Sequence, residues 1–153
     1  MVQARKSPWV KRMIILVVVL FVGAAGVYWY IATEHFTDTA KRKSAFTVNA
    51  LDFIREFRSN DSAANKKYGD KILTVNGRVS AVEAADTTIN IKFIDTTTGS
   101  YAIFAFQQQH LEEARKIAVG DSVSIKGSCS GGAYSEILGT EFISFKRSAL
   151  NKE

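Results

Sequence analysis

The residues with the clearest catalytic pattern are the five from Gly127 to Gly131, in the order Gly-Ser-Cys-Ser-Gly. Their spacing resembles the Gly-x-Ser-x-Gly nucleophile turn, with the single cysteine of the chain, Cys129, in place of serine. That chemistry needs a strand that turns into a helix, and a base beside the nucleophile. Here the pattern runs into a glycine-containing stretch, and His110 is the only candidate base. Because a lone cysteine is more often a small buried apolar residue, we expect no catalytic residue and no enzyme activity.

Metal and nucleotide sites lack the residues they need. The two histidines, His35 and His110, are far apart, and the chain has neither a cysteine pair nor a His-Glu-x-x-His motif. We expect His35 to be a surface residue and His110 to begin a helix. Neither of the two common glycine-rich phosphate-binding motifs occurs. The sequence therefore predicts no metal and no cofactor.

Polar and aromatic residues of the predicted strands are the candidates for ligand contact. We expect Lys92, Tyr101 and the segment 130–134 to line a contact surface, because an exposed tyrosine beside a Ser/Gly stretch suits adaptable contacts. The full set of predicted ligand-binding residues is Arg78, Lys92, Tyr101, Phe104 and Tyr134. The favoured partner is a protein, peptide or glycan of the cell envelope.

Binding of single-stranded RNA or DNA is the alternative function. It requires aromatic side chains for base stacking and a basic groove for the backbone. Aromatic residues are present on the second and third predicted strands, but at least half of them must fill the interior. The basic side chains near them are few, chiefly Arg78 and Lys92. We therefore expect nucleic acid not to be the partner.

Alternation of apolar and polar residues predicts five strands, at residues 71–82, 89–94, 101–106, 122–129 and 135–145. Residues 130–133 are predicted to form a flexible loop. Gly77 lies inside the first strand, where a side chain would normally pack, which indicates a bend, a bulge or a close backbone approach. Because a bent strand can serve two sheet layers, we expect residues 71–82 to be the first strand of a small closed barrel.

Helical spacing predicts the elements around these strands. Leu51, Ile54 and Phe57 recur on one face of a helix that Asn49 can cap. Residues 62–68 and 107–116 are predicted to form two further short helices. The order of three strands, a helix and two strands is that of an OB-fold, a five-stranded Greek-key barrel. The expected fold class is mainly β with helices, an OB-fold barrel that follows one transmembrane helix.

Residues 13–32 are 20 uncharged, mostly apolar residues, enough for a helix of about 30 Å, the thickness of a bilayer core. Trp9 precedes them, and residues 28–30 are Tyr-Trp-Tyr, which fits aromatic anchoring at both interfaces. A buried core helix and a cleaved signal peptide are the alternatives. No cysteine follows the segment closely enough for a lipoprotein anchor, and we expect an uncleaved, single-pass signal anchor.

The charge of the chain is unevenly distributed. Four basic residues precede the first acidic one, and without them the chain has 16 basic and 15 acidic side chains. Under the positive-inside rule the basic arm stays in the cytoplasm, so we expect the carboxy-terminal domain outside it, in the periplasm of a bacterial cell. The block Lys41-Arg42-Lys43 weakens this assignment, and it either contacts anionic headgroups or is solvated.

Three stretches resemble one known family. Residues 63–68 (Ala-Ala-Asn-Lys-Lys-Tyr), 71–79 (Lys-Ile-Leu-Thr-Val-Asn-Gly-Arg-Val) and 119–131, which includes Lys-Gly-Ser-Cys-Ser-Gly, are similar to the tRNA-anti-like OB-fold proteins. The resemblance covers about residues 49–145 and implies an OB-fold, often on a membrane or lipoprotein anchor. Many relatives carry a second cysteine near the position of Glu141, which this sequence lacks, so no disulfide is implied here.

The predicted organisation has five parts. A basic arm (1–12), a transmembrane helix (13–32) and a polar linker (33–48) precede the OB-fold domain with its helical lead-in (49–147), and a polar tail (148–153) ends the chain. The predicted function is a membrane-anchored binding module, of an oligomeric state that the sequence leaves open.

Overall fold

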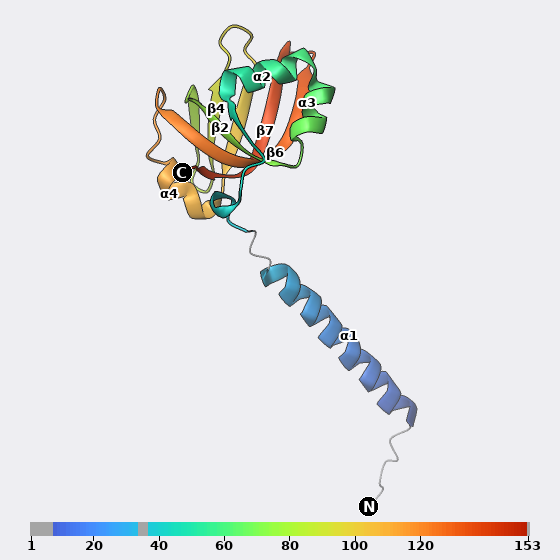
Figure 1. The fold of residues 1–153 in the computed structure, drawn as a ribbon. Coiled ribbons are helices and arrows are strands. Elements are labelled where there is room, and N and C mark those ends of the chain that lie inside the picture. The colour runs from blue at the N-terminus through green and yellow to red at the C-terminus, as the bar shows by residue number, and fades with distance from the viewer. Residues whose placement is uncertain (1–7, 34–36, 153) are drawn as a thin grey trace, which may run out of the picture. The chain divides into compact units, whose positions relative to one another are not determined.

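The computed structural model describes residues 8–33 and 37–152, and the chain forms two compact units, Met1–Phe36 and Thr37–Glu153. The predictions for the first seven residues and for His35 concern positions outside the described residues. Figure 1 shows the elements of both units along the chain.

The first unit contains helix α1 (Pro8–Thr33), whose apolar side chains are exposed to solvent. By length and composition α1 is able to cross a membrane, although a signal sequence near the N-terminus passes the same test. The helix is longer than the predicted span because Lys11 and Arg12 continue it with good helical propensity.

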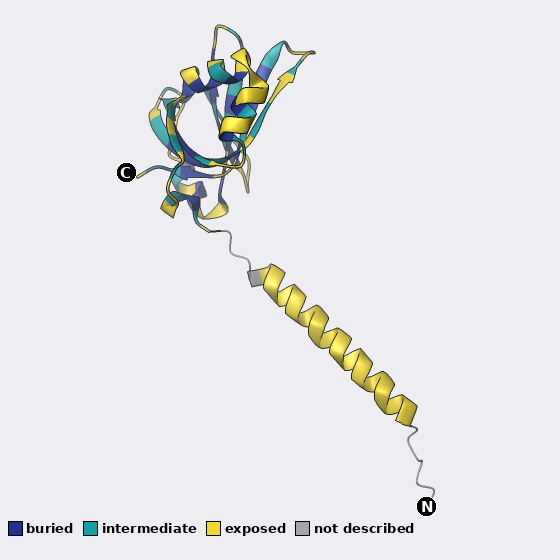
Figure 2. Cartoon of the chain, turned by 45° about the vertical axis from the view of Figure 1, so that its right-hand side comes forward, coloured by how far each residue is buried: buried dark blue, intermediate teal, exposed yellow. Residues whose placement is uncertain are grey.

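The second unit is built on one seven-stranded mixed sheet. Its strands are β1 (Phe46–Asn49), β2 (Ile72–Arg78), β3 (Ala81–Ala84), β4 (Ile89–Ile94), β5 (Tyr101–Phe106), β6 (Ser122–Ser135) and β7 (Thr140–Leu150). They are arranged in the order β1-β2-β6-β7-β5-β4-β3. The sheet curls strongly, as Figure 2 shows, and its buried residues face inward. This arrangement confirms the OB-like fold, although the sheet is not the closed five-stranded barrel that the sequence predicts.

The predicted first strand, residues 71–82, is divided into β2 and β3 at Val79 and Ser80. The Val79 N–H donates to the carbonyl of Asp121 at 2.8 Å, whereas the Ser80 N–H donates to that of Lys92 at 2.9 Å. The backbone therefore changes its neighbour between two consecutive residues, and β2 pairs with β6 while β3 pairs with β4. The sequence analysis expected a strand that serves two sheet layers. In the structure this stretch pairs with two different parts of one sheet, and the break lies two residues after Gly77.

The last two strands are longer than predicted. β6 continues to Ser135 and includes residues 130–133, which the sequence analysis assigned to a flexible loop, and the turn lies at residues 136–139. β7 continues to Leu150, so that Ala149, predicted to be in a polar tail, is fully buried. Two register shifts between β6 and β7 explain the error, because each bulge interrupts the alternation on which the prediction rests.

Residues 37–45, which we call the strap, belong to the folded domain and not to a linker. The Thr39 N–H donates to Gln107 at 3.2 Å, Nζ of the buried Lys126 contacts the Ala40 carbonyl at 3.4 Å, and the Ala45 N–H donates to Ile72 at 2.7 Å. The strap contains the 3₁₀ turn η1 (Thr39–Lys41) and leads into β1, which pairs in parallel with β2. The sequence analysis did not assign the strap to the folded domain because its residues are polar. Its contacts with the domain are hydrogen bonds to backbone and polar groups, which leave no apolar pattern in the sequence.

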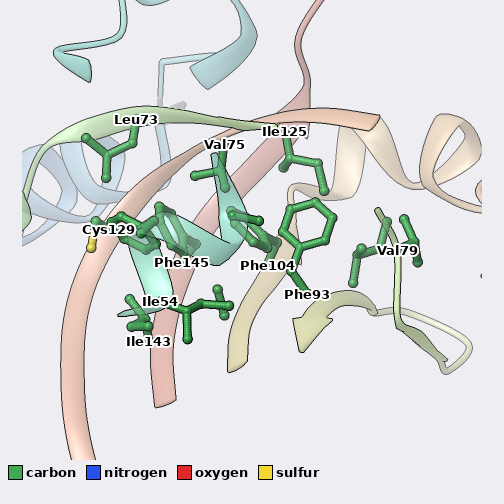
Figure 3. Packing of buried hydrophobic residues seen from close by; sticks show 14 of the residues in the cluster. Ile54, Leu73, Val75, Val79, Phe93, Phe104, Ile125, Cys129, Ile143 and Phe145 are labelled. Carbon is green, nitrogen blue, oxygen red and sulfur yellow. The ribbon is translucent and has the colours of Figure 1, made fainter. Parts of the chain in front are cut away.

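Helices α2 (Ala50–Ser59) and α3 (Asp61–Tyr68) cover one end of the curled sheet (Figure 1). The Asn49 side chain accepts hydrogen bonds from the first turn of α2, as predicted, and Asn60 caps α3 in the same way. Phe53 and Phe57 of α2 are buried, and the Phe53 ring lies 5.7 Å from that of Phe145. Figure 3 shows the core beside these residues, where Ile54 of α2 lies with Phe104 and Phe145.

The helix predicted at residues 107–116 is shorter in the structure. It consists of the 3₁₀ turn η2 (Gln108–His110) and α4 (Leu111–Ala114), with His110 at the start of α4 as expected. The Nε2 atom of His110 lies 2.7 Å from Oδ1 of Asp38 in the strap, and this hydrogen bond is the chief cause of a lowered Asp38 pKa. The last element before β6 therefore holds the first residues of the domain.

Glu141, in β7, is a buried carboxylic acid. It is 1% exposed, and its Oε1 atom makes no hydrogen bond to another described residue. Burial raises the Glu141 pKa, and the negative charge of Asp61 raises it further, against the opposite effect of Arg58. Folding therefore favours the protonated form of this side chain.

We predict that Gly77→Ala destabilises the domain by about 1–3 kcal/mol, the usual cost of overpacking. A Cβ atom at position 77 would lie 2.6 Å from the Cβ of Ala50 and 3.3 Å from the Phe93 ring, so α2 would have to move. Denaturant unfolding checks this, with the exposed neighbour Asn76→Ala as the control. Equal free energies of unfolding for Gly77→Ala and wild type would contradict it.

We predict that Glu141→Gln raises stability near neutral pH and loses this advantage at acid pH. A pKa raised by folding adds stability that is fully present below the unfolded-state pKa and is lost as the pH rises through the folded-state pKa. The glutamine has no such loss. Thermal unfolding at about pH 4 and about pH 7 measures the difference, with exposed Glu136→Gln as the control. A pH-independent difference between wild type and Glu141→Gln would show that Glu141 does not titrate as proposed.

Candidate functional site

The outer face of β4, β5 and β7 presents an aromatic pair to solvent. Tyr101 of β5 and Phe142 of β7 are partners in a parallel ladder, and their rings stack at 6.4 Å with an interplanar angle of 27°. Phe142 is 38% exposed, a large fraction for a phenylalanine within a sheet. The face is therefore suited to contact with a flat, partly apolar group.

Lys92 of β4 brings positive charge to the same face. Its Nζ atom lies 5.1 Å from the centre of the Tyr101 ring, within the range of a cation–π interaction, and it forms an ion pair with Glu83 of β3. The Lys92 ammonium group therefore contacts both the Tyr101 ring and the Glu83 carboxylate. Lysine and the two rings make a short strip of mixed charge and aromatic surface.

The turn that leads into Tyr101 is fixed by Asp95. Its carboxylate accepts the Thr97 N–H at 3.0 Å, which is the chief cause of its lowered pKa, and it pairs with Nε of Arg55 at 3.3 Å. Arg58 donates to Ser100 Oγ at 3.4 Å. Two arginines of α2 therefore contact the turn beside the aromatic pair, and Arg55 is more than half exposed there.

The structure separates the predicted ligand-binding residues. It brings Lys92 and Tyr101 together, but Phe104 is fully buried, with its ring stacked on Phe145 at 4.3 Å. The choice of Phe104 as a contact residue is therefore wrong. Phe104 lies three residues after Tyr101 in β5 and so on the opposite face of the strand. Figure 3 shows its ring in the core. Arg78 donates to the Gly120 carbonyl at 2.9 Å from the end of β2.

Tyr134 is half exposed, but it lies in strand β6 opposite Glu141 and not in a loop. The hairpin turn that follows carries Ile137 and Leu138, which are 96% and 70% exposed. In OB-folds the loop at this position and the face of the second and third strands are the usual contact regions. The roles of Arg78 and Tyr134 stay predictions.

Sequence reasoning missed Phe142 and the two arginines of α2. Phe142 reaches the face through the parallel pairing of β5 with β7, which are about 40 residues apart in the chain, and no local pattern records that register. Arg55 and Arg58 lie outside the apolar face of the predicted helix, and their place beside the turn follows from tertiary packing.

Cys129 is fully buried in the core, as expected from its isolation in the sequence. Burial is the main cause that raises its pKa to about 11, and the nearby Asp70 adds to the effect. The segment after it continues as a strand, so the strand-to-helix turn that a nucleophile needs is not formed. In the part of the chain that the structure describes, no group of three metal-ligating side chains occurs.

The topology and the exposed face define an OB-fold protein. The tRNA_anti-like family matches residues 2–139, and the chain belongs to that family. No curated protein matches the chain.

Solved structures give a consistent fold. A lipoprotein from Klebsiella pneumoniae, to which nucleic-acid binding is assigned provisionally, has 14% identity and a TM-score of 0.53, with 69% of this chain and 91% of that chain covered. The asparaginyl-tRNA synthetase of Pyrococcus horikoshii has 18% identity over 55% of this chain, with a TM-score of 0.37. The aspartyl-tRNA synthetase of Entamoeba histolytica has 15% identity over 55%, with a TM-score of 0.39. This chain spans about a fifth of each synthetase.

These comparisons correct one prediction. The sequence analysis disfavoured nucleic acid as a partner and favoured an envelope protein, peptide or glycan. The Klebsiella structure that shares the fold is instead a lipoprotein to which nucleic-acid binding is provisionally assigned. The sequence analysis disfavoured nucleic acid because of the low net charge, which averages over the whole domain and does not describe any single face.

We predict that native Cys129 reacts with iodoacetamide at least roughly a hundredfold more slowly than the same thiol in denaturant near pH 8. The thiolate is the nucleophile, and a pKa raised to about 11 by burial depletes it. Mass spectrometry of timed samples, with and without denaturant, measures both rates. Comparable rates would show an accessible or activated thiol.

Proposed function

We propose that the domain binds single-stranded nucleic acid on the outer face of β4, β5 and β7. The observation that carries this proposal is the solvent-facing stack of Tyr101 and Phe142 with the Lys92 ammonium beside it. Proteins that bind single strands combine aromatic side chains, on which bases stack, with cations that contact the backbone. The provisional assignment of the Klebsiella lipoprotein, which shares the fold, supports the same class of ligand.

The geometry favours single strands over duplexes. A stacked pair on a curled sheet offers a flat platform to an unpaired base, whereas a duplex hides its base faces. Arg55, at the turn beside the platform, is more than half exposed and offers a further contact for a phosphate. Every base has a face that stacks on an aromatic ring, so we expect binding with little sequence preference.

We propose in addition that α1 anchors this module to a membrane and that the protein has no catalytic activity. The length and apolar composition of α1 and the lipoprotein nature of the similar structure support the anchor. The burial of Cys129 and the engagement of His110 by Asp38 support a binding role over catalysis.

The test is fluorescence anisotropy of the full-length protein in detergent with a labelled single strand of about 12 nucleotides. We predict that Tyr101→Ala and Phe142→Ala each weaken binding by about five- to a hundredfold, since stacking contributes about 1–3 kcal/mol per base. Affinity should also fall between about 50 mM and about 200 mM salt.

Two control variants sharpen this experiment. Tyr101→Phe keeps the ring and should bind like wild type, and Val119→Ala truncates an apolar side chain that is 63% exposed outside this face. Absence of salt-dependent binding, or an equal loss in Val119→Ala and Tyr101→Ala, would falsify the proposal.

A further inference from the structure

A second polar site lies on the strap side of the domain, away from the aromatic face. It is a cavity of about 520 Å³ between the strap, the start of β2 and the β6–β7 ladder. Four basic residues line it, Arg42, Lys43, Lys71 and Arg147, against a single acidic one, Asp70. None of Lys92, Tyr101 and Phe142 is among its lining residues. Its charge therefore favours an anion, and its size fits a small-molecule group.

The backbone is distorted at two points of the cavity wall. Among the described residues, Asp70 and Arg147 are the two that have a positive φ without being glycine, at 59° and 52°. Both line this cavity. Aspartate tolerates this left-handed conformation, but for arginine it is strained, and glycine would adopt it freely. Strained residues cluster at binding sites, where the surrounding structure maintains them.

Arg147 is placed by a bulge. The register of β7 with β5 shifts between Phe145 and Ser148, and its register with β6 shifts between Lys146 and Ala149, so both irregularities include position 147. A β-bulge of this kind redirects a side chain and is common beside functional sites. The fold thus uses an irregular backbone at a position where the side chain is a guanidinium that lines the cavity.

The other three basic residues come from the strap and from the residue before β2. The Arg42 N–H donates to the Thr39 carbonyl at 3.1 Å, and the Ser44 hydroxyl bonds that of Thr74 at 2.5 Å, which fixes the strap on both sides of Lys43. Lys71 donates to the Lys67 carbonyl at 2.6 Å, and its Nζ lies 5.4 Å from the centre of the Phe46 ring. The backbone that carries Arg42 and Lys43 is therefore ordered before any ligand arrives, which lowers the entropy lost on binding.

We propose that this cavity binds the phosphate group of an anionic phospholipid. Guanidinium groups form paired hydrogen bonds with phosphate oxygens, and lysines add charge. The position in the chain indicates a lipid as the source, because only residues 33–36 separate Thr37 from the apolar segment and five Cα steps extend at most about 18 Å. This choice of ligand rests on the proposed membrane anchor, whereas the nucleic-acid site does not.

The test uses the full-length protein in a neutral detergent, titrated with dioctanoyl phosphatidylglycerol and followed by calorimetry. We predict that Arg147→Gly weakens binding at least tenfold while the thermal unfolding midpoint stays the same or rises, because glycine relieves the strained φ. Arg42→Gln with Lys43→Gln should weaken binding in the same way. The matched control is Lys116→Gln, which removes one exposed charge outside the cavity.

Parallel titrations separate the ligand sources. Dioctanoyl phosphatidylcholine and inorganic phosphate should both bind more weakly than dioctanoyl phosphatidylglycerol. Tyr101→Ala should leave phosphatidylglycerol binding unchanged. Equal losses in Arg147→Gly and Lys116→Gln would reduce the effect to general charge and overturn the site. Inorganic phosphate as strong as the lipid would assign the cavity to a free anion. A loss of oligonucleotide binding in Arg147→Gly, with no lipid binding in wild type, would assign it to nucleic acid.

Discussion

The change of hydrogen-bond partner between Val79 and Ser80 is the constraint on which the domain depends. One peptide donor points to the turn before β6 and the next to β4, so a continuous stretch of chain occupies two separate places in the sheet. The sheet has to curl for both pairings to exist. Gly77 lets α2 pack directly on the inner face of the curled sheet, because the helix approaches β2 too closely for a side chain at that position.

The curl separates two kinds of chemistry on one small domain. The outer face of β4, β5 and β7 carries the stacked rings, and the surface between the strap and the β6–β7 bulge carries the clustered cations. Each depends on a departure from a regular antiparallel ladder: the parallel β5–β7 pairing for the first and the register shift at Arg147 for the second. A protein with both functions would hold a nucleic acid and a membrane at once.

Local patterns in the sequence predicted the elements whose stability is local. The Asn49 cap, the alternation of Ile89–Ile94 and the buried Cys129 all follow from chemistry within a few residues. The errors occur where a distant partner decides the outcome. Phe104 and Tyr101 are equally aromatic in the sequence, and only the pairing of β5 with two neighbours determines which one is inside. The strap was predicted to be a linker because its sequence is polar. The hydrogen bond that buries Thr39 is made to Gln107, 68 residues away, and no local pattern indicates it.

The strap and β1 also protect an edge. β1 is the outermost strand on one side of the sheet and satisfies the backbone groups along β2 that would otherwise be open. An open edge next to the apolar Leu73 and Val75 is a template for pairing with another copy of the chain. A soluble fragment that begins at Asn49, where the first predicted helix starts, would thus expose this edge and tend to aggregate. One that begins before Asp38 would keep it covered, so the polar segment behind α1 also protects an edge of the sheet during folding.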